Sequence, residues 1–152
     1  MAIARGAGTE IIRSIHVEAV NDTASECLIF GEQHHIYTVL SIIVFASAVN
    51  ASGDWVRVSL NPGYDTKGAD TAQPIYLFEQ GLSSRQTFVW NDKFSFSGHE
   101  PTDFSDATMN SIAKQNALAD QGSSVAQKLM VEVQHASDNF DIHCTYIDQN
   151  NA

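Results

Sequence analysis

The chain has 152 residues, which is enough for one ordinary domain with a hydrophobic core and leaves little room for a second. Aspartate and glutamate number 18 against 8 lysine and arginine residues, and the formal net charge of -10 argues against direct binding to nucleic acid or to an anionic membrane. Only 17% of the residues are charged, below the roughly 25% of an average soluble domain, so we expect a surface of uncharged polar groups or of apolar area that a partner covers.

The chain opens with a glycine- and alanine-rich segment, residues 1–9, which we expect to be an extended N-terminal arm. A strand is predicted over Glu10–Ala19, because Ile11, Ile15 and Val17 fall on one face when side chains alternate. An arm of this kind is suited to lie along a neighbouring subunit.

The longest predicted strand, Ile36–Ala48, follows a short apolar strand at Glu26–Gly31. Almost every position from Ile36 to Ala48 is apolar or small, which indicates that both faces of the strand are buried. In a small antiparallel domain one of these faces packs on the core. The other face must then meet a second layer or another subunit.

A further strand is predicted over 55–60, ahead of a polar loop at 61–73. Its inward residues by alternation are Val56, Val58 and Leu60. Trp55 and Arg57 then face outward. Short strands are predicted next, at Ile75–Glu79, Thr87–Trp90 and Lys93–Phe96, and a short helix is predicted near 107–118.

The chain closes with a predicted hairpin whose turn is the Ala-Ser-Asp-Asn cluster at 136–139. Its first strand, Lys128–Gln134, has on one face Leu129, Val131 and Val133. Its second strand has on one face Phe140, Ile142, Cys144 and Tyr146. The whole pattern predicts an all-β fold for residues 10–152: a single antiparallel β-sandwich, jelly-roll-like, of about eight strands.

Cys27 and Cys144 lie far apart, and neither has the CxxC or Cys/His spacing of a structural zinc site. No secretory signal or apolar stretch long enough to span a bilayer is visible, so we expect a soluble protein made in a cytosol. In a reducing compartment both thiols are expected to be buried small hydrophobes, without a disulfide.

Histidine pairs provide no convincing metal site. His34 and His35 are adjacent and would point to opposite faces of a strand, so we interpret them as part of a polar turn. His135 and His143 could meet across the final hairpin, but no third ligand is identifiable. We expect no metal and no cofactor.

Acidic residues at Glu100, Asp103 and Asp106 lack the spacing of a calcium loop and are interpreted as solvated surface. No nucleophile-elbow, phosphate-binding or dinucleotide-binding motif is present, so no catalytic residue is assigned. A hydrolase would require two acids, or a histidine and an aspartate, in one pocket.

Aromatic residues provide the stronger signal. Trp55, on an outward face, is compatible with a subunit interface, with the edge of the core or with a ligand platform. Trp55, Tyr64 and Trp90 together would form a sugar-stacking platform if they converged in one exposed groove. The plain alternative for Trp90 is that it caps the core.

Several segments carry a resemblance at the level of pattern. They are the run Glu26–Ile43, a valine-rich strand ending near Leu60, the run Gln73–Phe78 and the closing pair Lys128–Ile147, whose final strand has an acidic end. The chain resembles the small β-sandwich virion proteins of tailed bacteriophages, which decorate or cement the capsid or sit at the neck and tail. The likeness covers residues 26–97 and 128–147 loosely, and residues 98–127 depart from it.

The resemblance implies a non-enzymatic structural protein of the virion, assembled in the host cytoplasm. Its partners would be other virion proteins, namely major capsid, neck or tail subunits, and further copies of itself in a symmetric homo-oligomer. Direct contact with nucleic acid or membrane is not expected. The expected interface residues are Ala4, Arg5, Tyr37, Val39, Ile43, Phe45, Trp55, Arg57 and Tyr64. The alternative function is a carbohydrate- or receptor-binding module on the virion.

Overall fold

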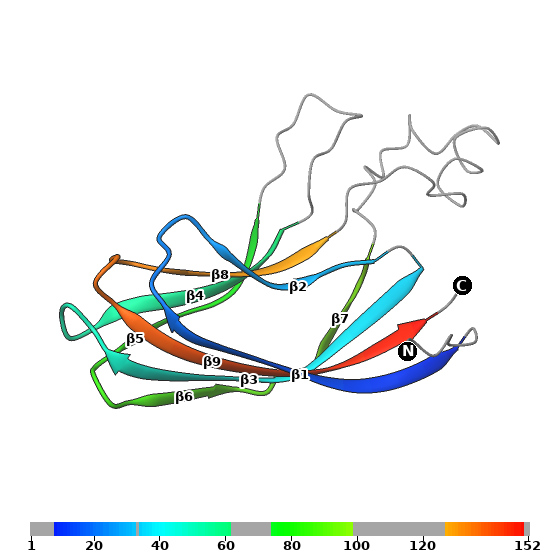
Figure 1. The fold of residues 1–152 in the computed structure, drawn as a ribbon, viewed down its shortest axis with the longest axis horizontal. Coiled ribbons are helices and arrows are strands. Elements are labelled where there is room, and N and C mark those ends of the chain that lie inside the picture. The colour runs from blue at the N-terminus through cyan, green and yellow to red at the C-terminus, as the bar shows by residue number, and fades with distance from the viewer. Residues whose placement is uncertain (1–7, 33, 62–73, 99–126, 151–152) are drawn as a thin grey trace, which may run out of the picture.

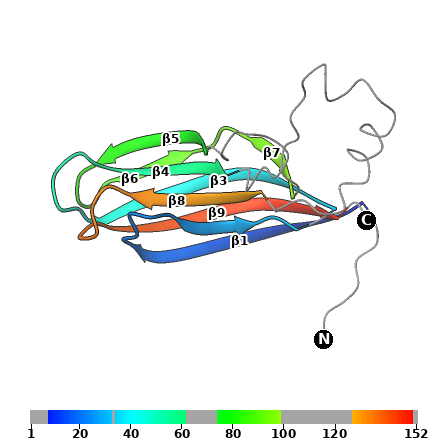
Figure 2. The same ribbon diagram turned by 90° about the horizontal axis from the view of Figure 1, so that it is seen from above.

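The computed structural model describes residues 8–32, 34–61, 74–98 and 127–150, and all regular elements in this part of the chain are β-strands. They form two antiparallel sheets that stack face to face (Figures 1 and 2). The predicted all-β sandwich is therefore confirmed. The helix predicted near 107–118 and most of the predicted arm lie outside the described residues.

The larger sheet has five strands, in the order β1-β9-β3-β6, with β7 paired to β3 beside β6. These strands are β1 (Thr9–Val20), β9 (Asn139–Asn150), β3 (His35–Ala48), β6 (Thr87–Trp90) and β7 (Phe94–Ser97). Strands β6 and β7 follow one another along the same edge of β3, opposite 42–45 and 36–39 respectively. Together they form one interrupted edge strand.

The smaller sheet has four strands, in the order β2-β8-β4-β5. These strands are β2 (Glu26–Phe30), β8 (Lys128–Val133), β4 (Asp54–Asn61) and β5 (Ile75–Leu82). The closing hairpin contributes β8 to this sheet and β9 to the other, so its turn at one end of the sandwich connects the two layers.

The core is the space between the sheets, and alternation identifies most of its members. All three inward positions predicted in β8 are at most 1% exposed. In β9, Phe140, Ile142 and Cys144 are 0% exposed and Tyr146 is 7% exposed, as predicted. Burying these apolar side chains supplies the dominant driving force for folding, at about 25 cal/mol per Å² removed from water.

Two irregularities change which residues face the core. The pairing of β3 with β9 shifts between Val39 and Ser41, so Leu40 is an extra residue that reverses the alternation. Before the shift the inward residues have odd numbers, and after it they have even numbers, beginning with Ile42. A similar shift between Cys27 and Ile29 in β2 leaves Cys27 exposed.

The two cysteines are both free. Burial raises the pKa of the Cys144 thiol to about 12, which matches the prediction of a buried small hydrophobe. Cys27 is exposed on the outer face of the four-stranded sheet, so the prediction that it is buried was wrong. The described residues contain no helix that could cross a bilayer.

Candidate functional site

The outer face of the five-stranded sheet is the surface that points away from the four-stranded sheet. Residues paired across antiparallel strands point to the same side of a sheet. Ile12 pairs with Ile147 across β1 and β9, and Ile43 pairs with Val89 across β3 and β6. Ile12, Val89 and Ile43 are 70%, 54% and 37% exposed. This face therefore presents branched apolar side chains near both lateral edges of the sheet.

The rest of the outer face is mostly uncharged. Its hydroxyl-bearing residues, identified by the register, are Ser14, Thr145, Ser41, Thr38, Ser95, Ser97 and Thr87. The Thr38 and Ser95 hydroxyls lie 2.9 Å apart and hydrogen-bond across β3 and β7. None of the paired residues on this face is a lysine or an arginine. Covering hydroxyls costs less hydration free energy than covering the same number of charged groups.

Two histidines interrupt the outer face. His16 and His143 are paired across β1 and β9, and their ring centroids are 6.0 Å apart. Glu18 Oε1 lies 3.5 Å from His16 Nε2. Within the described part of the chain no three histidine, cysteine or acidic side chains are grouped so as to hold a metal ion. The pair is a polar element of the surface.

The predicted interface residues fall on different surfaces. Ile43 and Phe45 lie on the outer face of the five-stranded sheet, after the shift in β3. Tyr37 and Val39, which precede it, point inward and are 3% and 0% exposed. Their prediction as interface residues was wrong. It assumed unbroken alternation along β3, whereas the extra residue at Leu40 reverses which side chains face outward.

Three of the remaining predicted interface residues, Ala4, Arg5 and Tyr64, lie outside the described residues. Trp55 and Arg57 face outward on the four-stranded sheet, as alternation predicted. The Arg57 guanidinium lies 4.3 Å from the centroid of Trp55 and 4.4 Å from that of Tyr76. It also pairs with Glu132 and, at 3.4 Å, with Glu79. The Arg57 guanidinium is thus paired with two carboxylates and stacked on two rings.

Trp90 does not share a surface with Trp55. It pairs with the buried Ile42 and therefore points between the sheets, where its ring centroid is 5.9 Å from that of Phe78 and 5.5 Å from that of Phe94. The sugar-stacking groove that required both tryptophans to converge is thus not formed. The plain alternative, in which Trp90 caps the core, is the one that the structure supports.

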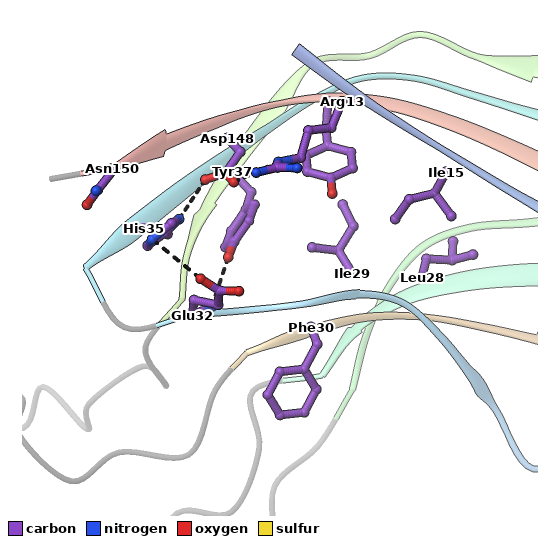
Figure 3. A pocket seen from close by; sticks show the side chains of 11 residues that line it. Arg13, Ile15, Leu28, Ile29, Phe30, Glu32, His35, Tyr37, Asp148 and Asn150 are labelled. Atoms are coloured by element: carbon purple, nitrogen blue, oxygen red, sulfur yellow. Dashed lines mark hydrogen bonds and ion pairs between the residues drawn. The ribbon is translucent and has the colours of Figure 1, made fainter. Parts of the chain in front are cut away.

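A pocket of about 420 Å³ opens between the sheets where β1 and β2 face one another (Figure 3). Its apolar lining comes from Ile15, Leu28, Ile29 and Phe30. Its polar lining comes from Arg13, Glu32, His35, Tyr37, Tyr146, Asp148 and Asn150. Predicted only as part of a polar turn, His35 instead begins β3 and points into this pocket.

A buried carboxylate organises the polar end of the pocket. The side chain of Asp148 is 7% exposed and accepts hydrogen bonds from His35 Nδ1 at 2.6 Å and from Arg13 Nε at 3.0 Å. His35 Nε2 lies 3.5 Å from Glu32 Oε2, and the Glu32 N–H donates to the Tyr37 hydroxyl at 2.9 Å. Residues from β1, β3 and β9 and from the turn after β2 are thereby held together.

The two tyrosines of the pocket are shielded from water. Burial raises the pKa of Tyr37 to about 12, and the nearby carboxylates of Asp148 and Glu32 add to the shift. Burial likewise raises the pKa of Tyr146, against the opposing effect of the Arg13 guanidinium. Both phenols therefore stay neutral at physiological pH and can act as hydrogen-bond donors or acceptors.

The pocket does contain a histidine and an aspartate in contact, one of the arrangements that a hydrolase would require. The lining residues include no serine, threonine or cysteine, and the only hydroxyls among them are the phenols of Tyr37 and Tyr146. The arrangement holds the strand ends together. A usable signal was present in the sequence, because Asp148 continues the inward series of β9 and an acid at a buried position requires a partner.

Comparison with known proteins yields little similarity. No protein-family model matches the chain, and no curated protein sequence matches it. A solved structure of Bacillus endospore appendages, described as a family of disulfide-linked pili, has a TM-score of 0.41 and 10% sequence identity, covering 100% of this chain and 97% of that chain. Similarity of this extent does not identify a family.

Proposed function

We propose that this protein is a non-enzymatic structural subunit that associates with neighbouring subunits through the outer face of its five-stranded sheet. The observation that carries the proposal is the chemistry of that face. Ile12, Ile43 and Val89 are exposed there, and no paired residue of the face is a lysine or an arginine. A solvated antiparallel sheet normally alternates apolar-in with polar or charged-out, whereas most of the paired residues on this outer face are apolar or carry a hydroxyl.

The charge distribution supports the same conclusion. The chain has a net charge of -10 yet leaves the middle of this face free of lysine, arginine and acid, with Ser14, Thr145 and Ser41 in register across three strands. Charged residues are depleted at the centres of protein interfaces. The acids of the face, Glu10, Glu18 and Asp141, lie toward its ends, where an interface is typically polar.

The finer part of the proposal is the assembly itself. We propose that it is the virion of a tailed bacteriophage, with this protein decorating or cementing the capsid or belonging to the neck or tail. The pattern of segments along the chain supports this, together with the acidic net charge, which suits a position away from the packaged genome. The chain would act as a symmetric homo-oligomer bound to other virion proteins.

The association is tested by replacing apolar residues of the outer face with lysine. Val89→Lys and Ile43→Lys should convert an oligomer into a monomer, measured as mass by light scattering coupled to size exclusion. Thr23→Lys, at an exposed position outside the face, is the matched control and should leave the mass unchanged. A wild-type chain that is monomeric at all accessible concentrations and does not bind a particle would overturn the proposal.

The virion assignment needs a separate measurement. A labelled copy of the chain should co-sediment with phage particles and appear at regular positions on them by electron microscopy. The Val89→Lys variant should co-sediment less. If the label is absent from the particles while the chain still self-associates, the virion assignment is wrong. The chain would then be a structural subunit of a different assembly.

A further inference from the structure

We infer that the pocket between β1 and β2 receives residues 1–7 of a neighbouring copy of this chain, as an extended segment. The inference rests on the proposed function, because it names the contact by which one subunit would hold the next. It is carried by the edges that border the pocket, by the side chains that line it and by the place where the segment joins the fold.

Both strands that border the pocket are edge strands. β1 pairs only with β9, and β2 pairs only with β8, among the strands that the structure describes. The opposite edge of each strand offers backbone N–H and C=O groups for pairing. A pocket bounded by two such edges suits an extended peptide, which satisfies them through its own backbone, better than a compact small molecule.

The lining of the pocket complements residues 1–7 in two respects. Ile15, Leu28 and Ile29 form an apolar wall. Arg13 pairs with Asp148, so the Glu32 carboxylate faces no second lysine or arginine among the lining residues. A segment with an apolar side chain and a cation on one side would match both.

Residues 1–7, Met-Ala-Ile-Ala-Arg-Gly-Ala, have this character. Ile3 and Arg5 are two positions apart and share one side of an extended chain, and the segment has no acid. Ile3 would lie on the apolar wall while Arg5 meets the Glu32 carboxylate, whose side chain is 70% exposed. The alanines and glycine on either side are small enough to fit between two strand edges.

Chain direction favours a neighbouring copy over the same copy. Gly8 N donates to Asn150 O, and Asn150 lines the pocket, so Gly8, to which residues 1–7 are joined, lies at the pocket's polar end. To enter its own pocket the segment would have to reverse direction, which takes a turn of about four residues. The remainder would span only about 10 Å, whereas the whole segment of a neighbour spans about 24 Å when extended.

Disulfide cross-linking between full-length chains tests the inference. In a Cys27→Ser background, one chain carries Ile3→Cys and a second, distinguishable by mass, carries Ile15→Cys. Mixing them under mild oxidation should give the mixed dimer on a non-reducing gel. The other native thiol, Cys144, is 0% exposed and stays out of the reaction.

The matched control is Ser14→Cys, whose side chain is on the opposite face of β1 from that of Ile15. It should cross-link about tenfold less, because it lacks the high effective concentration that binding gives Ile15. Equal yields at the two positions would overturn the inference. A disulfide that forms only when both cysteines are in one chain would assign the pocket to that chain's own segment and would also overturn it.

Charge exchange gives a second, independent readout. Arg5→Glu on the Ile3→Cys chain should lower the yield of the mixed dimer, and Glu32→Arg on its Ile15→Cys partner should restore it. If neither substitution changes the yield of the mixed dimer, the proposed contact between Arg5 and Glu32 is wrong. If light scattering shows self-association that Val89→Lys abolishes while no cross-link forms, the pocket assignment fails and the structural role stands.

Discussion

The two lateral edges of the sandwich differ in how the sheets meet. At the β5/β6 edge, Phe78 packs against Phe88 and Trp90 with ring centroids 5.1 and 5.9 Å apart. At the β1/β2 edge the sheets leave a pocket, and ion pairs around Asp148 hold the polar end together. One edge is sealed by packing, and the other is kept open and organised by charge.

The contrast shows how a single sandwich can assign different tasks to its two sides. Aromatic packing excludes water, so the contacts of Phe78 at the β5/β6 edge add to stability. Hydrogen bonds to Asp148 fix the geometry of Arg13 and His35 while leaving space beside them. The β1/β2 edge is therefore the one at which we propose that a partner segment binds.

The largest effect is expected from breaking the aromatic edge. Phe78→Ala should lower the free energy of unfolding by about 3 kcal/mol, because it removes apolar burial and leaves a gap between the rings of Phe88 and Trp90. Urea unfolding followed by tryptophan fluorescence measures the loss. Ile15→Ala at the open edge is the comparison and should cost clearly less. Equal costs would show that the two edges contribute alike to stability.

A somewhat smaller effect is expected from alkaline pH acting on the pocket. The pKa of Tyr37 is about 12 in the folded chain, against 10.0 when the phenol is exposed, so the unfolded chain ionises first as the pH rises. The contribution of the neutral Tyr37 phenol to the free energy of unfolding is fully present below pH 10. It decreases by about 2 kcal/mol as the pH rises to 12.

Denaturant unfolding of the wild type and of Tyr37→Phe across this pH range isolates that contribution. The variant cannot ionise at position 37, so its stability should fall less steeply between pH 10 and 12. Cys144, whose pKa also rises to about 12, is present in both chains and cancels in the comparison. Parallel pH curves for the two proteins would contradict the assignment.

The smallest of these effects is expected at the organising carboxylate. Asp148→Asn keeps the shape of the side chain but weakens the hydrogen bonds from His35 and Arg13, and should cost about 1.5 kcal/mol. Thermal unfolding at pH 7 checks the value. Asp141→Asn, on the outer side of the same strand, is the control. A cost no greater than the control's would mean that the pocket does not need its buried charge.

Much of the fold was predictable because strands in this chain follow a period of two. The predicted strand at 87–90 has the observed bounds, and the inward residues of β8 and β9 are as predicted. The site was far less predictable. Arg13, His35 and Asp148 come from three different strands, and their proximity depends on β9 lying between β1 and β3. No local pattern in the sequence indicates this strand order.

The amino-acid sequence by itself determined the all-β class, the faces of the regular strands and the shortage of charge, because alternation and composition are local properties. Only the tertiary structure decided where alternation breaks. Because of the extra residue at Leu40, Val39 points into the core while Ile43 points outward. The shift after Cys27 leaves its thiol exposed. A bulge is set by pairing with a neighbouring strand, so its position emerges only when distant segments meet.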